Sequence, residues 1–508
     1  MFKSTLTNVV SVNFPNQAQI EVHLTVDSTP SQQQKKLKTL SQYIQKYPSG
    51  WKKRLELADL LYALGDWDNA IKEYQTVLKR KPTLIEVWLK IGHIFHLRWA
   101  TKEAIHSYES ALALCSNDAI KEQIKGLIES CQGRYQAALK VIQVATTLNP
   151  DNAAHWFALG ITYLRMESPG EALQTFEEFF KLKPNDIKGL YYSHDALLAM
   201  GKIETAQKKL AIALKLAPNH INVLERVIAH RLRQRLVTEN EDKKTWLLID
   251  QALKLAPDAV NIQALLAYYY LFRGEPTKGL TILQRLIKDH WNNPGGWYHY
   301  AHCLFYLDKR QEAATAILKA YQLYQKDWEI NRTLCEMLPL VGKLEPLKPL
   351  VAEILENFPE RWSVWATTGR VLVEHFQDIE QGSYLSAQAI NLQPQLSDAW
   401  CHHGRVLTLG GKHREAIEVL EQGWQCLPEG ESCLQSVLLA AQLGENYRNL
   451  GEKVHSRCWW DLTAYHAQKL MNFHPTFGDY WQNRAAQALE DNYKIKSVYF
   501  PSLNQFLA

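Results

Sequence analysis

The sequence lacks the features of exported, membrane-spanning and disulfide-bonded proteins. Its longer apolar runs, such as residues 437–441, fall far short of the roughly 20 residues that a membrane-spanning helix requires. The N-terminal residues MFKSTLTNVVSVNFPNQ contain neither a continuous apolar segment nor the small-residue cleavage site of a secretory signal. The 8 cysteines are scattered, and none forms a CxxC pair. These absences favour a cytoplasmic protein with reduced cysteines.

Catalytic and metal-binding motifs are also missing. The sequence contains no GxxxxGKS/T, GxSxG, GxGxxG or HExxH pattern. Cys401, His402 and His403 are consecutive, but neighbouring residues on a helix point about 100° apart and cannot all ligate one ion. We therefore expect no metal, no cofactor and no enzymatic activity.

The charges are nearly balanced, since 57 Lys and Arg stand against 53 Asp and Glu and give a net charge of +4. A charge this small gives no global electrostatic reason to expect nucleic acid or an anionic membrane as a partner. The apolar fraction of 46% and the charged fraction of 22% are typical of a globular chain. An acidic partner would therefore have to bind a local patch.

What the sequence does contain is an internal repeat of 34 residues. Tryptophans recur at multiples of this period, because Trp88 and Trp156 are 68 residues apart, as are Trp297 and Trp365. Prolines recur with spacings of 34, 68, 34 and 34 residues at Pro48, Pro82, Pro150, Pro184 and Pro218. Both series show the same excess of 5 residues after Pro218, which indicates one insertion in a regular array.

The clearest repeat runs from residue 153 to about residue 186. Its apolar residues recur at helical spacing, which predicts two amphipathic helices separated near Pro169 and ended by Pro184. Small residues, Gly160 and Ala172, stand where two helices would approach each other closely, and large rings stand nearby. This pattern resembles the tetratricopeptide repeat (TPR) family, and we count about eleven full copies between roughly residues 51 and 430.

The resemblance implies an all-α fold, a right-handed superhelix of helix-turn-helix repeats called an α-solenoid. We expect about 12 repeats and a capping helix at 478–490 within a continuous solenoid at 31–490, with an insertion near 231–245 and irregular repeats near 328–361 and 431–477. Residues 1–30 alternate apolar and polar positions, which predicts either a small β-hairpin or an unstructured arm. Residues 491–508 form a tail that either folds back or docks into a partner.

A TPR solenoid implies a non-catalytic protein-interaction scaffold or adaptor, because the family binds peptides, helices or partner proteins in its concave groove. The segments outside the repeats are too short for a catalytic domain. No repeat carries the Lys and Asn pair of the carboxylate clamp, which argues against co-chaperones that dock heat-shock chaperone tails. The asparagine ladder of TPR glycosyltransferases is missing as well. Partner identity and oligomeric state stay open.

Two sets of residues are candidates for the groove, on the register that the resemblance implies. The first, between about residues 153 and 306, combines aromatic rings with a few polar groups: Phe157, Arg165, Tyr191, Asp195, Tyr268, Phe272, Tyr298, His302 and Tyr306. Its rings either form an open binding surface or pack against the neighbouring repeat. The second set is Arg370, Glu374 and Arg405, which we expect to be either a polar binding site or a self-compensating ion network.

A basic patch is a third candidate, and it motivates the alternative functions. Its members are Lys35, Lys36, Lys38, Lys46, Lys52, Lys53, Arg54, Arg231, Arg233 and Arg235. Such a patch favours either a phosphate or acidic partner or a solvated helix face that keeps the chain soluble. A nucleic-acid-binding helical repeat protein and an obligate regulatory subunit of an enzyme complex are therefore alternatives to the scaffold.

Overall fold

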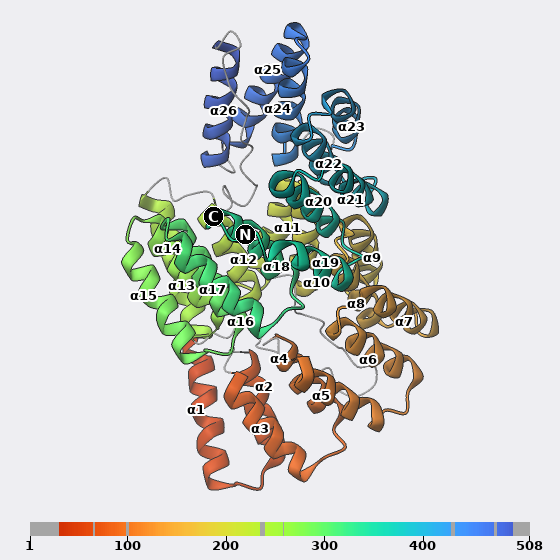
Figure 1. Cartoon of the computed structure of the whole chain (residues 1–508). Helices are drawn as coiled ribbons and strands as arrows, with labels where there is room; N and C mark the ends of the chain where they lie inside the picture. The colour runs from red at the N-terminus through yellow and green to blue at the C-terminus, as the bar shows by residue number, and fades with distance from the viewer. Residues whose placement is uncertain are drawn as a thin grey trace.

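The computed structural model describes residues 30–63, 67–97, 101–233, 239–257, 259–427, 432–471 and 475–490. Over these ranges the chain forms 26 helices and no strand. Consecutive helices pair antiparallel and stack side by side into a coil (Figure 1). The predicted all-α solenoid is confirmed. The candidate β-hairpin and the C-terminal tail lie outside the described residues.

Each repeat contributes a first helix and a second helix. The first helices are α2 (Trp51–Ala63), α4 (Ile85–Leu97), α6 (Asp118–Cys131), α8 (Ala153–Arg165), α10 (Ile187–Ala199), α12 (Ile221–Arg233), α14 (Val260–Phe272), α16 (Pro294–Tyr306), α18 (Trp328–Leu340), α20 (Trp362–Phe376), α22 (Ser397–Leu409) and α24 (Leu434–Asn449). The second helices are α3 (Trp67–Arg80), α5 (Thr101–Leu114), α7 (Tyr135–Leu148), α9 (Pro169–Leu182), α11 (Ile203–Leu216), α13 (Glu239–Leu255), α15 (Pro276–Asp289), α17 (Arg310–Leu323), α19 (Leu347–Asn357), α21 (Ile379–Leu392), α23 (His413–Gln425) and α25 (Lys453–Leu470). α1 (Pro30–Lys46) precedes this series and α26 (Pro475–Glu490) follows it.

The small residues of the repeat admit large rings from the second helix. A β-carbon built on Gly160 of α8 would lie 2.5 Å from the ring of Phe176 on α9. A β-carbon on Gly92 of α4 would likewise lie 2.6 Å from the ring of Tyr108 on α5. No side chain fits at either position, so glycine is what lets the two helices of a repeat pack closely.

The tryptophan and proline periods coincide because the two residue types hydrogen-bond. The indole Nε1 of Trp156 donates to the carbonyl oxygen of Pro150 at 2.7 Å, and Trp365 and Trp400 donate to Pro359 and Pro394 at 2.8 Å. Three repeats without tryptophan here replace the indole by another donor, which reaches the carbonyl six residues earlier: Arg54, Gln263 and Asn331. Where it forms, the bond ties a first helix to the loop before it.

The helices vary most where the sequence departs from the repeat. α13 has 17 residues and follows the undescribed residues 234–238. α19 has only 11 residues, and Pro339 lies inside the last turn of α18. α24 and α25 are lengthened to 16 and 18 residues, which takes up the extra residues of the last full repeat.

Successive turns of the coil touch along a line that we call the seam, formed by residues 135–136, 167–168, 360–363 and 393. Glu167, in the loop between α8 and α9, accepts hydrogen bonds from Ser363 N at 3.2 Å and Ser363 Oγ at 2.7 Å, 196 residues along the chain. Glu360 in turn accepts one from Gln136 N at 2.8 Å, at the start of α7. Each glutamate therefore caps a helix of the other turn.

Among the described residues, no helix is both long enough and apolar enough to cross a membrane.

Candidate functional site

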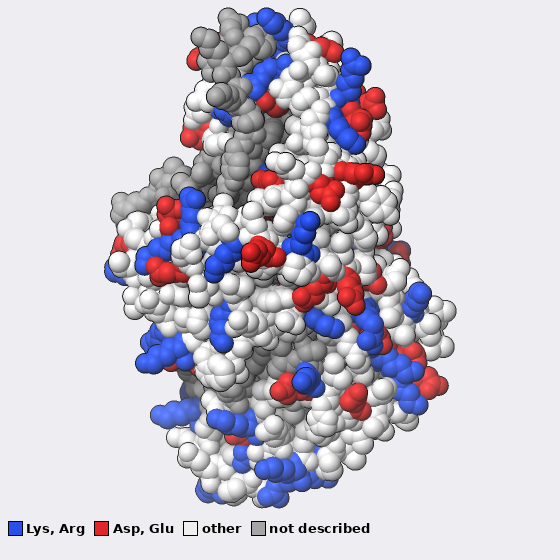
Figure 2. Space-filling view, viewed as in Figure 1, with Lys and Arg blue, Asp and Glu red and all other residues white. Residues whose placement is uncertain are grey.

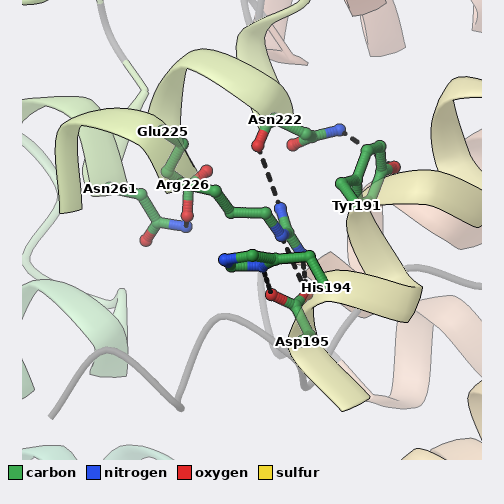
Figure 3. A network of polar contacts seen from close by, with 7 residues as sticks. All are labelled: Tyr191, His194, Asp195, Asn222, Glu225, Arg226 and Asn261. Carbon is green, nitrogen blue, oxygen red and sulfur yellow. Dashed lines mark hydrogen bonds and ion pairs between the residues drawn. The ribbon is translucent and has the colours of Figure 1, made fainter. Parts of the chain in front are cut away.

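The inner face of the coil carries a buried polar network at α10, α12 and α14. Tyr191 and Asp195 come from α10, Glu225 and Arg226 from α12, and Asn261 from α14 (Figure 3). Because each repeat places its first helix beside the next one, residues about 31 to 36 apart in sequence face each other here. The network therefore links three successive first helices.

An ion pair between Asp195 and Arg226 is the centre of this network. Arg226 donates from Nε at 2.8 Å and from Nη2 at 2.6 Å to Asp195 Oδ2, and His194 Nδ1 lies 2.9 Å from Asp195 Oδ1. Burial alone would raise the pKa of Asp195, but Arg226 and His194 hold it below its usual value. The pair stays charged although both side chains are buried.

Arg226 also packs on two aromatic rings. Its guanidinium carbon lies 4.4 Å from the ring centroid of Tyr191 and 5.3 Å from that of Tyr192. Asn222 Nδ2 donates to the Tyr191 hydroxyl at 3.5 Å, and burial raises the pKa of that hydroxyl. Tyr191 is 1% exposed, so this ring belongs to the packing between α10 and α12.

Glu225 is the acid of this network without a close cation. Burial raises the pKa of its carboxyl to about 7, against the lowering effect of Arg226. Asn261 Nδ2 donates to its Oε1 at 3.2 Å. Glu225 therefore changes charge near neutral pH, and it does so between two packed helices.

Four of the predicted groove rings are packed between helices. Phe157, Tyr191, Tyr268 and Tyr298 are all between 1% and 3% exposed. The centroid of Phe157 lies 5.4 Å from that of Phe179 on the second helix of its own repeat. An open aromatic surface at these four positions is therefore wrong, because adjacent first helices approach closely enough to close over the rings.

Two of the predicted rings remain at the surface. Tyr306 is 39% exposed, and Phe272 is half-buried with its ring centroid 5.8 Å from that of Tyr306. Each residue ends a first helix, Phe272 on α14 and Tyr306 on α16. His302 is buried, and its Nε2 lies 3.5 Å from Thr333 Oγ1 on α18. Of the predicted rings, Phe272 and Tyr306 are therefore the two that stay accessible.

Arg165 ends α8 at the same register and carries a charge without a counterion. It is 3% exposed and donates from Nη1 to Ser130 Oγ on α6. Its Nε and Nη2 have no partner, and no carboxylate of the described residues lies within ion-pair distance. Burial and the charge of Arg165 together hold the pKa of the nearby His96 well below its usual value. An unpaired buried charge is costly.

The predicted mixed-charge set is brought together, and it is largely self-compensating. Arg370 Nη1 donates to Glu374 Oε2 at 2.9 Å, and Arg370 Nη2 lies 3.8 Å from Glu336 Oε1. Burial would raise the pKa of Glu374, but Arg370 and Arg405 hold it below its usual value.

The basic patch is only partly a free surface. Lys35, Lys36, Lys38, Lys46 and Lys52 are exposed on α1 and α2. Lys53 Nζ lies 2.8 Å from Glu56 Oε1, and Arg54 pairs with Glu73. Arg231 is half-buried, while the Arg233 side chain and Arg235 lie outside the described residues.

The sequence interpretation missed Arg226, Glu225, His194 and Asn261 as parts of the inner network. A usable signal existed, because polar pairs on successive first helices recur at a spacing of 31 residues rather than 34: Asp59 and Lys90, Tyr62 and His93, Asp195 and Arg226, Tyr268 and His299, His302 and Thr333. Within the described residues, no group of three or more His, Cys, Asp or Glu side chains could hold a metal ion.

Family models match three parts of the chain. A model described as TPR repeat matches residues 58–97, and one described as tetratricopeptide repeat matches residues 127–187. A third, described as anaphase-promoting complex, cyclosome, subunit 3, matches residues 241–320.

Similar proteins differ widely in their names. DnaJ homolog subfamily C member 3 of Gallus gallus is 22% identical over 365 residues, 66% of this chain and 72% of that protein. Protein O-mannosyl-transferase TMTC3 of Homo sapiens is 24% identical over 347 residues, 66% of this chain but only 34% of that protein. A solved crystal structure of MamA protein is 27% identical, covers 33% of this chain and 91% of its own, and has a TM-score of 0.23.

Proposed function

Since the chain is a tetratricopeptide-repeat protein, we propose that it is a non-catalytic interaction scaffold whose inner face binds a segment of a partner protein. One observation carries the choice of site. Among the predicted rings in the described residues, Phe272 and Tyr306 are the accessible pair, and each ends a first helix. Aromatic side chains give a large contact area at a low cost in conformational entropy.

Arg165, at the end of the earlier first helix α8, supports the same site. It occupies the register position of Phe272 and Tyr306, and two of its nitrogens have no partner among the described residues. Because these nitrogens are buried, the Arg165 side chain would have to turn outward to meet a carboxylate of the partner segment, which would then supply the missing counterion through a charge-assisted hydrogen bond. We therefore propose a partner segment that combines apolar and acidic side chains.

Four further properties belong to this proposed function. The chain is not itself a transferase, although it matches 34% of the length of TMTC3. It acts in the cytoplasm, as the sequence predicts, and it assembles a complex. The absence of the carboxylate clamp keeps heat-shock chaperone tails outside its proposed partners.

The test is a pull-down with the full-length chain from its native extract, read by mass spectrometry, with a nuclease-treated sample in parallel. Phe272→Ala/Tyr306→Ala is the site variant. Tyr384→Ala/Tyr465→Ala is the matched control, since both rings are exposed, at 64% and 55%, on second helices. We expect stoichiometric protein partners that survive nuclease and are lost only from the site variant.

Retention of the same partners by the site variant would exclude this site. Partners that disappear with nuclease would favour the nucleic-acid alternative. A catalytic partner that gains or loses turnover with the chain present would identify it as a regulatory subunit.

A further inference from the structure

A cavity of about 670 Å³ lies between α3, α4 and α5, away from the inner network. Its floor is apolar and consists of Leu78, Trp88, Ile91 and Phe95. Ser107 of α5 forms part of its wall. A volume of this size is within the range of about 300–1,000 Å³ that ligand pockets occupy.

The cavity lies where two hydrophobic cores adjoin along α4. Buried residues from Leu40 to Ile94 form one core, and those from Leu89 to Val227 form the next. Trp88 and Phe95 are only partly buried and touch both cores. α3 and α4 share the first core, to which Val77 and Ile91 belong, so these two partly buried rings mark the boundary between the cores on the side of α4 that faces α5.

A comparison with another joint shows what is missing here. Two repeats farther along, Gln143 Nε2 of α7 donates to the Tyr163 hydroxyl of α8 at 3.4 Å. At the cavity the same register positions hold Gln75 and Phe95. Phenylalanine has no hydroxyl, so this tie between the second helix and the next first helix cannot form.

The mouth of the cavity is basic. Lys79 of α3 and Lys102 of α5 are exposed beside it, and neither forms an ion pair among the described residues. Glu103 and His106 complete the rim. Residues 30–97 contain twelve Lys and Arg against six Asp and Glu, a larger excess than the +4 of the whole chain. Lys and Arg side chains gather over the lower end of the molecule, where α1–α3 lie (Figure 2).

We propose that this cavity is a second docking site, which takes one bulky apolar side chain from an acidic segment of a partner protein. The apolar floor receives Leu, Phe or Trp, and Lys79 and Lys102 pair with carboxylates that flank it. The site is separate from the inner face, since it lies on the two outer-lying second helices α3 and α5 with α4 between them. One chain thereby holds two partners, or one partner at two points.

The test is selection of random twelve-residue peptides displayed against the full-length chain, followed by fluorescence polarisation of the enriched peptides. Two variants address the two halves of the site. Ser107→Phe fills the cavity, and Lys79→Glu/Lys102→Glu reverses the mouth without touching the core. Lys208→Glu/Lys215→Glu on α11 is the matched control, since Lys215 occupies the register position of Lys79 and both lysines are exposed.

We expect enriched peptides with one bulky apolar residue between acidic ones. Their affinity should fall about tenfold or more in both site variants, stay unchanged in the control, and weaken as salt is added. A helical circular dichroism signal equal to that of the wild type would show that the Ser107→Phe variant folds. If that variant does not fold, the Lys79→Glu/Lys102→Glu variant tests the proposal by itself.

Three results would overturn the proposal. Peptides that bind the site variants as well as the wild type would place their site elsewhere. If no acidic peptide is enriched, acidic protein segments are excluded as ligands of the cavity. A labelled single-stranded RNA that loses binding in the charge reversal but not in Ser107→Phe would assign the basic surface to nucleic acid.

Discussion

The joint at α3–α5 and the seam in the middle of the coil show two ways in which a solenoid can be held together. At the joint, helices that follow one another in the chain pack together, and their interface is left with a cavity of about 670 Å³. At the seam, loops 196 to 225 residues apart in the chain bond to each other. Repeats that meet only their neighbours depend on each interface separately, whereas the seam links distant repeats.

Glu167 shows what the seam demands of the sequence. Its φ of 58° lies in the left-handed region, where most other repeats place glycine, for example Gly201 and Gly342. A non-glycine residue there costs about 1–2 kcal/mol. The two hydrogen bonds from Ser363 and the nearby Arg361 guanidinium, 3.8 Å from the Glu167 carboxylate, offset that cost.

The largest expected effect comes from removing Arg361. This buried side chain lies 5.3 Å above the ring of Tyr135 across the seam. Burial raises the pKa of the neighbouring Asp327 to about 7, and Arg361 opposes that rise. Arg361→Ala leaves the carboxylates of Asp327 and Glu167 without this cation. The free energy of unfolding in urea should therefore fall by about 3–5 kcal/mol. Arg285→Ala, whose side chain is 85% exposed, should change it by less than about 0.5 kcal/mol.

Glu225 gives the next effect, which depends on pH. Its folded pKa of about 7 lies above the ordinary 4.5, so the folded state holds a proton that the unfolded state has already lost. The free energy of unfolding should therefore fall as pH rises from 4.5 to about 7. Above pH 7, Glu225→Gln should be more stable than wild type by about 1–3 kcal/mol.

Urea titrations across this pH range check the Glu225 prediction. Glu177→Gln, an exposed position on α9, should keep the wild-type profile. A parallel displacement of the Glu225→Gln curve at every pH would mean that Glu225 does not titrate in this range.

The seam itself is tested by a pair of glycine substitutions. Glu167→Gly and Asp308→Gly both relieve a positive φ, of 58° and 56°. Only Glu167→Gly removes a contact between turns, so it alone should loosen the coil and increase its maximum dimension in small-angle X-ray scattering. Its net loss of stability should be about 1–2 kcal/mol, whereas Asp308→Gly should be neutral or slightly stabilising. Equal maximum dimensions for the two variants would show that the seam does not hold the turns of the coil together.

The smallest expected effect is a gain at the open joint. Phe95→Tyr supplies the hydroxyl that Tyr163 offers to Gln143 in the later repeat, and Gln75 stands at the matching position. The variant should gain about 0.5–1 kcal/mol toward thermal unfolding. Gln75→Ala combined with Phe95→Tyr should remove that gain, and a gain that persists without Gln75 would argue for simple filling of the cavity.

The sequence predicts the repeat well because many repeats carry the same local hydrogen bond. The indole of Trp156 is the donor and the backbone carbonyl of Pro150 is the acceptor, so the tryptophan and the proline that ends the preceding helix recur together in the sequence. The burial of Tyr268 and Tyr298 was not predictable from the sequence, because it depends on how closely successive first helices approach. The seam could not be predicted from the sequence, since the contact between Glu167 and Ser363 depends on the curvature accumulated over six repeats. The cavity was not predicted either, because it depends on the absence at Phe95 of the hydroxyl that Tyr163 carries at the matching position.

Hydrogen–deuterium exchange of the full-length chain tests the contrast between joint and seam most directly. Amides of α3 and α4 should open at a lower free energy than those of α7, α9 and α20. Glu167→Gly should lower protection at α7 and α20 and leave α3 and α4 unchanged. Equal protection of both regions in the wild type, or a Glu167→Gly variant with unchanged exchange at α20, would contradict the account.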